Sequence, residues 1–321
     1  MWTFIPHCGM GTPMKTLLSW AVLAVAVVAT GCGPTDAQLS DFDEDTAVNG
    51  AELGTSTRTY VRLRRDMRRC VSPMCGGYYV HDVNRATLRE EYVSGLDFST
   101  SGLSDEVQAD VFNAADGEVV LYGKLGPTEP RFQTRPFIVT SAWRGMPGVA
   151  AAAGESFYKT QAMNVQCFAA PCPTLKATKL HSTAATLATG LDTSRASLRL
   201  VDDAWLADQV MNKGALVAGK FRPGNTPGIN RELVLDVSQV FVKLPNVTQS
   251  CPRTAMMQCP AGKTAAMQRN ADRCIMPAGC VDPGFCAAYV PSCEPGYSLV
   301  SWSGGRYACQ QYACDPDFLF D

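Results

Sequence analysis

Histidine is scarce in this 321-residue chain, which contains only three such residues. The chain also lacks a Gly-x-Ser-x-Gly elbow for a serine nucleophile and a glycine-rich loop for a phosphate group. Once an N-terminal signal is removed, His81 and His181 are the two that stay, which is too few for a histidine-rich metal centre. The composition therefore argues against a hydrolase, and we expect no catalytic residue, no metal and no cofactor.

A strong net charge is absent as well. The formal net charge is −2, and 18% of the residues are charged. Proteins that bind nucleic acid over their whole surface are usually strongly basic, so an electrostatic partner would have to be bound by a local patch. Hydrophobic residues make up 46% of the chain, which is enough for more than one core, and the length indicates two or three domains.

The N-terminal segment resembles an export signal. Lys15 precedes an apolar run at residues 17–29, which suits a signal-peptide core and is short for a membrane span. The run ends in the sequence Ala-Thr-Gly-Cys at Cys32, which resembles a bacterial lipobox, with an ordinary signal peptide or a short membrane anchor as alternatives. We predict a signal peptide over residues 1–31 and lipidation of Cys32.

Two segments beside the signal have simpler interpretations. Residues 1–13 precede a well-formed signal that begins at Met14, so we expect them to be a misassigned extension. Residues 32–57 contain several acidic residues and no basic residue, and they predict a solvated tether behind the lipidated cysteine. Four acidic residues have the spacing of an EF-hand loop, namely Asp41, Asp43, Asp45 and Glu52. Thr46 stands where that loop needs glycine, which disfavours a calcium site.

The cysteines indicate an oxidising compartment. The chain has 14 of them, and setting aside Cys8 and Cys32 leaves an even number. We expect these to form disulfides: Cys70, Cys75, Cys167, Cys172, Cys251, Cys259, Cys274, Cys280, Cys286, Cys293, Cys309 and Cys314. Cys70 is expected to bond with Cys75, and Cys167 with Cys172, although these four thiols could in principle hold zinc. Thiol redox catalysis is disfavoured because it usually uses Cys-x-x-Cys at a helix start.

The central part of the chain is an internal duplication. A cysteine loop in residues 58–145 returns in residues 157–243, and both segments predict three strands, a short helix and two further strands. Residues 146–156 read as a linker of small residues. This order in so few residues is that of an OB-fold, so we predict a mainly β protein with two tandem OB-like small barrels, with a β-sandwich as the alternative.

The tail, residues 251–321, is a second duplication of two four-cysteine modules. The four cysteines from Cys251 to Cys280 are matched by the four from Cys286 to Cys314 at nearly constant offsets. Each module is too short to depend on a hydrophobic core alone, so disulfides must help to hold it. We predict a disulfide-rich tail in which no bond crosses from one module to the other.

One basic patch stands out in the first repeat. The segment from Arg58 to Arg69 contains six arginines and only one acidic residue, an aspartate. On a strand, Arg62 and Arg64 would share a face with Tyr60 while their neighbours point inward. We name Tyr60, Arg62, Arg64 and Arg68 as candidate binding residues for an anionic polymer such as surface polysaccharide or nucleic acid. The alternative is a solvated strand face.

The first cysteine loop also resembles a known family. The run from Arg64 through Cys70 to Cys75, Gly76, Gly77 and Tyr78 is similar to an uncharacterised domain family found in predicted lipoproteins of myxobacteria. The resemblance implies location and domain type but no chemistry.

We therefore expect an envelope-anchored, non-enzymatic binding or structural lipoprotein, at the outer membrane or cell surface rather than the inner membrane. Its expected partners are the membrane and an anionic polysaccharide, nucleic acid or envelope protein. The alternatives are an inhibitor or assembly factor acting through the tail, and an enzyme.

Overall fold

The computed structural model describes residues 57–85, 90–168, 170–224, 232–245, 251–255 and 257–319. The predictions of a signal peptide, of lipidation at Cys32 and of an acidic tether fall on residues 1–56, outside this range. No helix among the described residues has the length and apolar character needed to cross a membrane.

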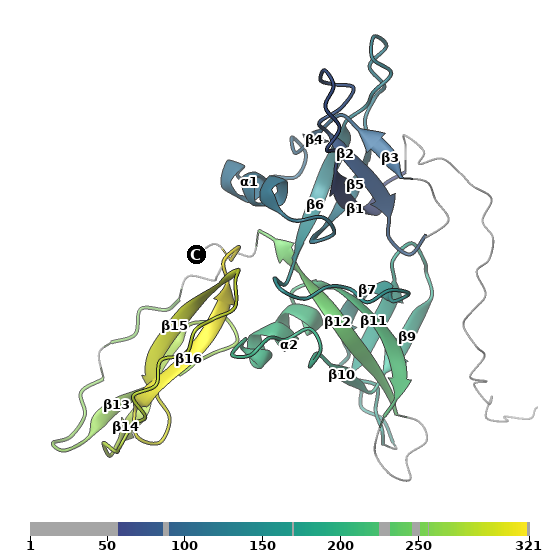
Figure 1. Cartoon of the computed structure of the whole chain (residues 1–321). Helices are drawn as coiled ribbons and strands as arrows, with labels where there is room; N and C mark the ends of the chain where they lie inside the picture. Colours follow the sequence, from purple (N-terminus) through teal and green to yellow (C-terminus); the bar gives the residue numbers. More distant parts are fainter. Residues whose placement is uncertain are drawn as a thin grey trace, which may run out of the picture. The chain divides into compact units, whose positions relative to one another are not determined.

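The first repeat folds into strands β1 to β6 and helix α1 (Figure 1). They are β1 (Thr59–Arg65), β2 (Tyr78–Asp82), β3 (Glu91–Val93), β4 (Leu96–Asp97), α1 (Asp105–Asn113), β5 (Val119–Leu125) and β6 (Phe137–Gly145). Alternation along β1 places Val61 and Leu63 in the core. Helix α1 begins where the Ser104 side chain accepts a hydrogen bond from Val107 N, an N-cap contact that satisfies a free backbone donor.

The second repeat has the same order of elements. They are β7 (Ser156–Ala162), β8 (Leu175–Lys179), β9 (Ala185–Ala188), β10 (Gly190–Asp192), α2 (Asp203–Met211), β11 (Leu216–Pro223) and β12 (Leu233–Leu244). Asp202 caps α2 by accepting from Ala204 N and Trp205 N. The helix buries Trp205, Leu206 and Val210 against the sheet, as the apolar spacing of the segment predicts.

Both repeats share one pairing scheme. In the first repeat, β1 pairs with β2 and β5, and β5 pairs with β6. In the second repeat, β7 pairs with β8 and β11, and β11 pairs with β12. All of these pairs are antiparallel. The third strand is split: β3 pairs with β2 and β4 runs parallel to β6, just as β9 pairs with β8 and β10 runs parallel to β12. Each repeat is thus OB-like and partly open, without a closed barrel.

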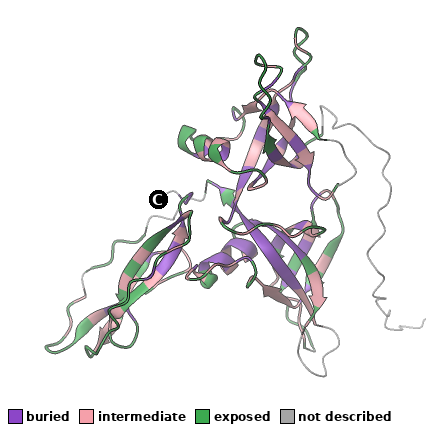
Figure 2. Cartoon of the chain, viewed as in Figure 1, coloured by how far each residue is buried: buried purple, intermediate pink, exposed green. Residues whose placement is uncertain are grey.

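The two repeats also share a sheet. Strands β6 and β12 pair antiparallel from Ala142 opposite Leu244 to Gly145 opposite Phe241, which creates a single twelve-stranded sheet. Strand β12 is therefore buried over most of its length, as Figure 2 shows. The mainly β fold with one helix per repeat is confirmed, but the repeats form one continuous structure rather than two separate barrels.

The tail forms a four-stranded sheet of β13 (Thr264–Arg269), β14 (Ile275–Val281), β15 (Tyr297–Gly304) and β16 (Cys309–Pro316). In each module the first cysteine bonds the third and the second bonds the fourth: Cys251 to Cys274, Cys259 to Cys280, Cys286 to Cys309 and Cys293 to Cys314. The remaining two disulfides join Cys70 to Cys75 and Cys167 to Cys172. The disulfide-rich tail is thereby confirmed.

An ion-pair network and a backbone hydrogen bond hold the tail against the second repeat. The Arg269 side chain is 2% exposed, donates to Asp315 Oδ1 at 2.7 Å, and lies 3.8 Å from the α2 cap residue Asp202. Cys314 N donates to Leu200 O at 2.8 Å. A buried guanidinium is costly unless it is paired. Because Asp315 belongs to the second module, Arg269 joins the two tail modules, and its longer ion pair with Asp202 adds a contact with the second repeat.

Candidate functional site

The candidate site lies on the outer face of the first three strands of repeat 1. Strand register places Arg62 opposite His81, and Arg64 opposite Tyr79. Tyr79 in turn lies opposite Tyr92 on β3. Because side chains alternate between the two faces of a strand, these residues share one surface, while Val61 and Leu63 point into the core.

One end of this surface is covered by the second repeat. The Tyr60 ring lies 4.6 Å from the ring of Tyr122, 5.7 Å from that of Trp143 and 5.8 Å from that of His181. Burial raises the pKa of Tyr60, with a further increase from Tyr122. Tyr60 is therefore half-buried and part of the contact between the repeats.

Arg62 lies at the boundary between the covered and the open part. Its guanidinium donates to Gly117 O at 3.3 Å and lies 5.7 Å from the Phe157 ring. Among the described residues its Nε has no hydrogen-bond acceptor, and no carboxylate lies within ion-pair distance. Burial lowers the pKa of Arg62, because the charged form loses hydration that no counter-ion replaces.

A pocket of about 220 Å³ opens beside Arg62. We call it the Arg62 pocket; its walls include Leu63, Arg64, His81, Glu90, Asp116 and Gly117. Gly117 has φ +79°, and a Cβ added there would lie 2.1 Å from Arg62 Nη2. Glycine at this position is therefore what allows the guanidinium to pass along the pocket wall.

At the open end, arginines and tyrosines alternate. The Arg64 guanidinium carbon lies 4.4 Å from the Tyr79 ring centroid, and that of Arg68 lies 5.5 Å from Tyr79 and 5.1 Å from Tyr92. We call these four residues the Arg–Tyr face. Arg64 forms a salt bridge with Glu90, with Nε 3.2 Å from Oε1. Stacked guanidinium and phenol groups present flat, polar edges to solvent.

The disulfide loop between β1 and β2 is ordered by a buried carboxylate. Asp66 has a side chain that is 1% exposed, and it accepts from Arg68 N at 3.0 Å, Arg68 Nε at 2.9 Å and Gly76 N at 3.3 Å. Hydrogen bonding from Arg68 lowers the pKa of Asp66. The loop is closed by the disulfide of Cys70 and Cys75 and tied to β3, where Tyr92 donates to Pro73 O at 2.8 Å.

Sequence reasoning missed several of these roles. It treated Asp66 only as a countercharge and Gly117 only as the residue that ends the helix, and it gave Tyr79 and Tyr92 no binding role. The sequence does contain one signal for the role of Asp66. A carboxylate between arginine pairs, shortly before a Cys-Gly-Gly turn, is typical of a side chain that accepts hydrogen bonds from backbone N–H groups. A Cβ on Gly77 would lie 2.1 Å from Val93 O, so the second glycine of that turn permits close contact with β3.

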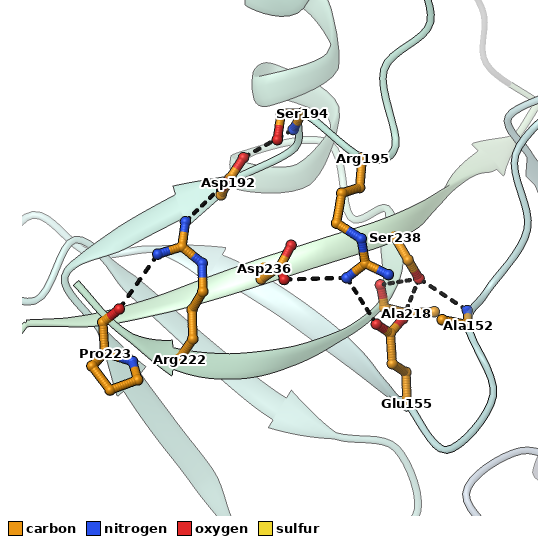
Figure 3. Close-up of polar contacts among 10 residues, drawn as sticks. All are labelled: Ala152, Glu155, Asp192, Ser194, Arg195, Ala218, Arg222, Pro223, Asp236 and Ser238. Carbon is orange, nitrogen blue, oxygen red and sulfur yellow. Dashed lines mark hydrogen bonds and ion pairs between the residues drawn. The ribbon is translucent and has the colours of Figure 1, made fainter. Parts of the chain in front are cut away.

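Among its described residues, the second repeat has no counterpart of the Arg–Tyr face. On its first strand the corresponding positions are Lys159 and Gln161, which are exposed. Its polar residues gather instead near β10 and β12, where Arg195 Nη1 contacts Glu155 at 3.0 Å and Asp236 at 3.2 Å (Figure 3). These groups satisfy one another, so they hold the linker onto the sheet.

A second ion pair in Figure 3 fixes β10. Arg222 donates to Asp192 Oδ2 at 2.7 Å, and Ser194 N donates to Asp192 Oδ1 at 3.0 Å. The Ser194 hydrogen bonds, together with Arg222, lower the pKa of Asp192 to about 2. Asp97 in the first repeat accepts from Ser99 N in the same way, which shows that this turn is shared by both copies.

These features define a mainly β protein with two fused OB-like repeats, one of which has an open Arg–Tyr face, and a disulfide-rich tail. The chain belongs to the family described as Domain of unknown function (DUF6748), whose model matches residues 59–246. The match spans both repeats, in agreement with their shared sheet.

One relative comes from Dictyostelium discoideum and is described as an uncharacterized protein. It is 22% identical over 289 residues, which cover 85% of this chain and 92% of that protein. No solved structure matches this chain.

Proposed function

We propose that this protein is a non-enzymatic binding module, held at the bacterial cell envelope by a lipid on Cys32, and that its first repeat binds an anionic polymer. Six disulfides support an oxidising environment outside the cytoplasm. The resemblance of the first cysteine loop to a family of predicted myxobacterial lipoproteins supports the location.

The observation that carries the proposal is the unpaired charge of Arg62. A partly buried guanidinium without a counter-ion is energetically unfavourable, and an anionic group in the Arg62 pocket would supply the missing partner. Phosphate, sulfate and carboxylate groups all accept bidentate hydrogen bonds from arginine. The site therefore fits an anionic substituent of a polymer.

The Arg–Tyr face supplies the second half of the proposed recognition. The guanidinium groups of Arg64 and Arg68 lie over the rings of Tyr79 and Tyr92, and bases or sugar rings of a polymer can stack against such flat arginine groups. A disulfide and the buried Asp66 hold the neighbouring loop in place before binding, which reduces the entropy lost when a ligand is bound. The Arg62 pocket can therefore bind the anionic group of one polymer unit, and the Arg–Tyr face can bind the ring of the neighbouring unit.

The test is a binding assay of the unlipidated protein against single-stranded DNA and an acidic polysaccharide over a range of salt concentrations. Two counter-ions released from a single strand predict a slope of about −1.4 in log affinity against log salt. Changing Arg62→Gln and Arg64→Gln together should abolish most of the binding. Arg68 is left intact because its loss would leave the buried Asp66 without its counter-ion.

A matched control removes two exposed arginines of the tail, by Arg253→Gln and Arg306→Gln. This variant has the same net charge and should bind like the wild type. Equal losses in both variants, or binding that does not depend on salt, would show that the Arg62 pocket has no part in recognition. The two polymers separate a nucleic-acid ligand from a polysaccharide one.

A further inference from the structure

A larger cleft lies apart from the Arg62 pocket, where both repeats, the linker and the second tail module meet. Its volume is about 760 Å³, within the range of small-molecule sites. We call it the tail cleft. Side chains from segments far apart in sequence line it, among them Asp110, Glu118, Arg144, Leu198, Glu294 and Phe318.

Specific contacts fix the walls of the tail cleft. The Tyr297 hydroxyl donates to Pro147 O at 3.0 Å, which joins the tail to the linker. Gly296 has φ +87°, and a Cβ there would come within 2.7 Å of Pro147, so glycine permits this close approach. Tyr297 is 8% exposed, and burial raises its pKa. The cleft is therefore bounded by a packed contact on its tail side.

The charge lining the cleft is mainly negative. Four carboxylates, those of Asp110, Glu118, Glu294 and Asp317, face two guanidinium groups, those of Arg144 and Arg199. The Arg144 group is shared, because its Nη1 lies 2.6 Å from Glu118 Oε2 and its Nε lies 3.3 Å from Asp110 Oδ2. Two carboxylates thus compete for one cation.

The negative charge of Asp110 in particular is only partly compensated. Its Oδ2 is buried and makes no hydrogen bond among the described residues, despite its proximity to Arg144. Burial raises the pKa of Asp110, against the opposing effect of Arg144. On the tail side, no basic group among the described residues forms an ion pair with Glu294 or Asp317, although Ser298 donates to Asp317. Arg199 also lines the cleft and forms no ion pair among the described residues, so carboxylates still outnumber guanidinium groups by two. An ammonium group would compensate part of this negative excess.

Apolar surface completes the cleft. Pro147, Leu198, Pro295 and Phe318 contribute to its walls, and Phe318 is 4% exposed. The Arg144 guanidinium carbon lies 5.8 Å from the Phe318 ring, so the acidic and the apolar parts adjoin. We propose that the tail cleft binds an organic ammonium group that carries an apolar chain, as in an alkylamine or the lysine side chain of a partner protein.

The experiment uses the full unlipidated chain and three six-carbon probes, hexylamine, hexanol and hexanoate, in calorimetric titrations at neutral pH. Hexylamine should bind more tightly than hexanol, and hexanoate should not bind. A peptide of alternating lysine and leucine forms a second arm. Binding of the peptide without hexylamine assigns the site to a protein partner, and binding of hexylamine assigns it to free amines.

The variant for this test changes Glu294→Gln and Asp317→Asn, both of which are exposed and should leave the fold intact. We expect ammonium affinity to fall about tenfold, because two attractive charges are lost. The control changes Glu129→Gln and Asp282→Asn, exposed carboxylates outside the cleft, and should keep wild-type affinity. Unchanged affinity in the first variant, equal binding of hexanoate, or binding of neither ammonium probe overturns the proposal.

Discussion

At the scale of single residues, the contact between Gly117 and Arg62 in the Arg62 pocket can be tested by measuring the stability of a Gly117 variant. A change Gly117→Ala would impose a positive φ on a residue with a side chain and would place its Cβ 2.1 Å from Arg62 Nη2. We expect the free energy of unfolding to fall by about 2 to 3 kcal/mol, as measured by denaturant titration.

The matched control is Gly102→Ala. Gly102 has φ +71°, and a Cβ there would meet no atom within 4 Å. The free energy of unfolding should fall only by the strain of a positive φ in the backbone, about 1 to 2 kcal/mol. The difference between the two variants then measures the contact with Arg62, and equal costs would mean that Arg62 moves aside freely.

His181 couples the stability of the repeat contact to pH. Its Nε2 lies 3.2 Å from Tyr60 O and 3.5 Å from Thr59 Oγ1, while Asp82 and Arg85 act on it with opposite sign. Burial lowers the pKa of His181 in the folded protein, whereas in the unfolded chain it takes up a proton near about pH 6.5. The unfolded state therefore binds more protons below that pH, and stability is lost as pH falls.

The measurement is the midpoint of chemical unfolding between pH 8 and pH 5. The wild type should lose stability below about pH 6.5, and His181→Gln should show a flatter profile over the same range. If both profiles coincide, another group accounts for the pH dependence.

At the scale of elements, strand β12 joins the two repeats. Phe241 is fully buried, lies opposite Gly145 of β6, and packs 5.6 Å from the Phe157 ring. Phe241→Ala should lower the free energy of unfolding by about 3 to 5 kcal/mol. Because the strand belongs to both cores, tryptophan fluorescence and circular dichroism should still report one transition.

Leu187→Ala provides the comparison for this prediction. Leu187 lies on the outer strand β9 and is 48% exposed, so its truncation should change stability by about 0.5 kcal/mol or less. Two separate unfolding transitions in the Phe241 variant would contradict the view that β6 and β12 unite the repeats.

Local pattern explains which elements could be predicted from sequence. The alternation of Val61 and Leu63 with polar neighbours specifies β1, and Ser104 with the acidic residues after it specifies the start of α1. The pairing of β6 with β12 depends on edges about 100 residues apart, which no local pattern encodes. The site was predicted only in part, because burial of Tyr60 and Arg62 depends on the same junction.

At the scale of the whole molecule, we predict that the protein is attached to the membrane through Cys32, which lies outside the described range. Acyl chains contribute about 0.8 kcal/mol for each buried methylene, so a lipid on Cys32 should hold the protein firmly. Cys32→Ser should abolish acyl labelling and release the protein into the soluble fraction. Membrane retention by this variant would rule out lipidation as the anchor.

The shared sheet has one more consequence, which concerns what happens when the repeats are cut apart. In the intact chain, β6 and β12 occupy each other's free edge from Ala142 to Gly145 and from Phe241 to Leu244. A fragment that ends in the linker would present this edge to solvent, where unpaired backbone donors and acceptors are templates for aggregation and strand exchange. Each repeat therefore protects the other from self-association, and a divided protein would be expected to pair with its own copies.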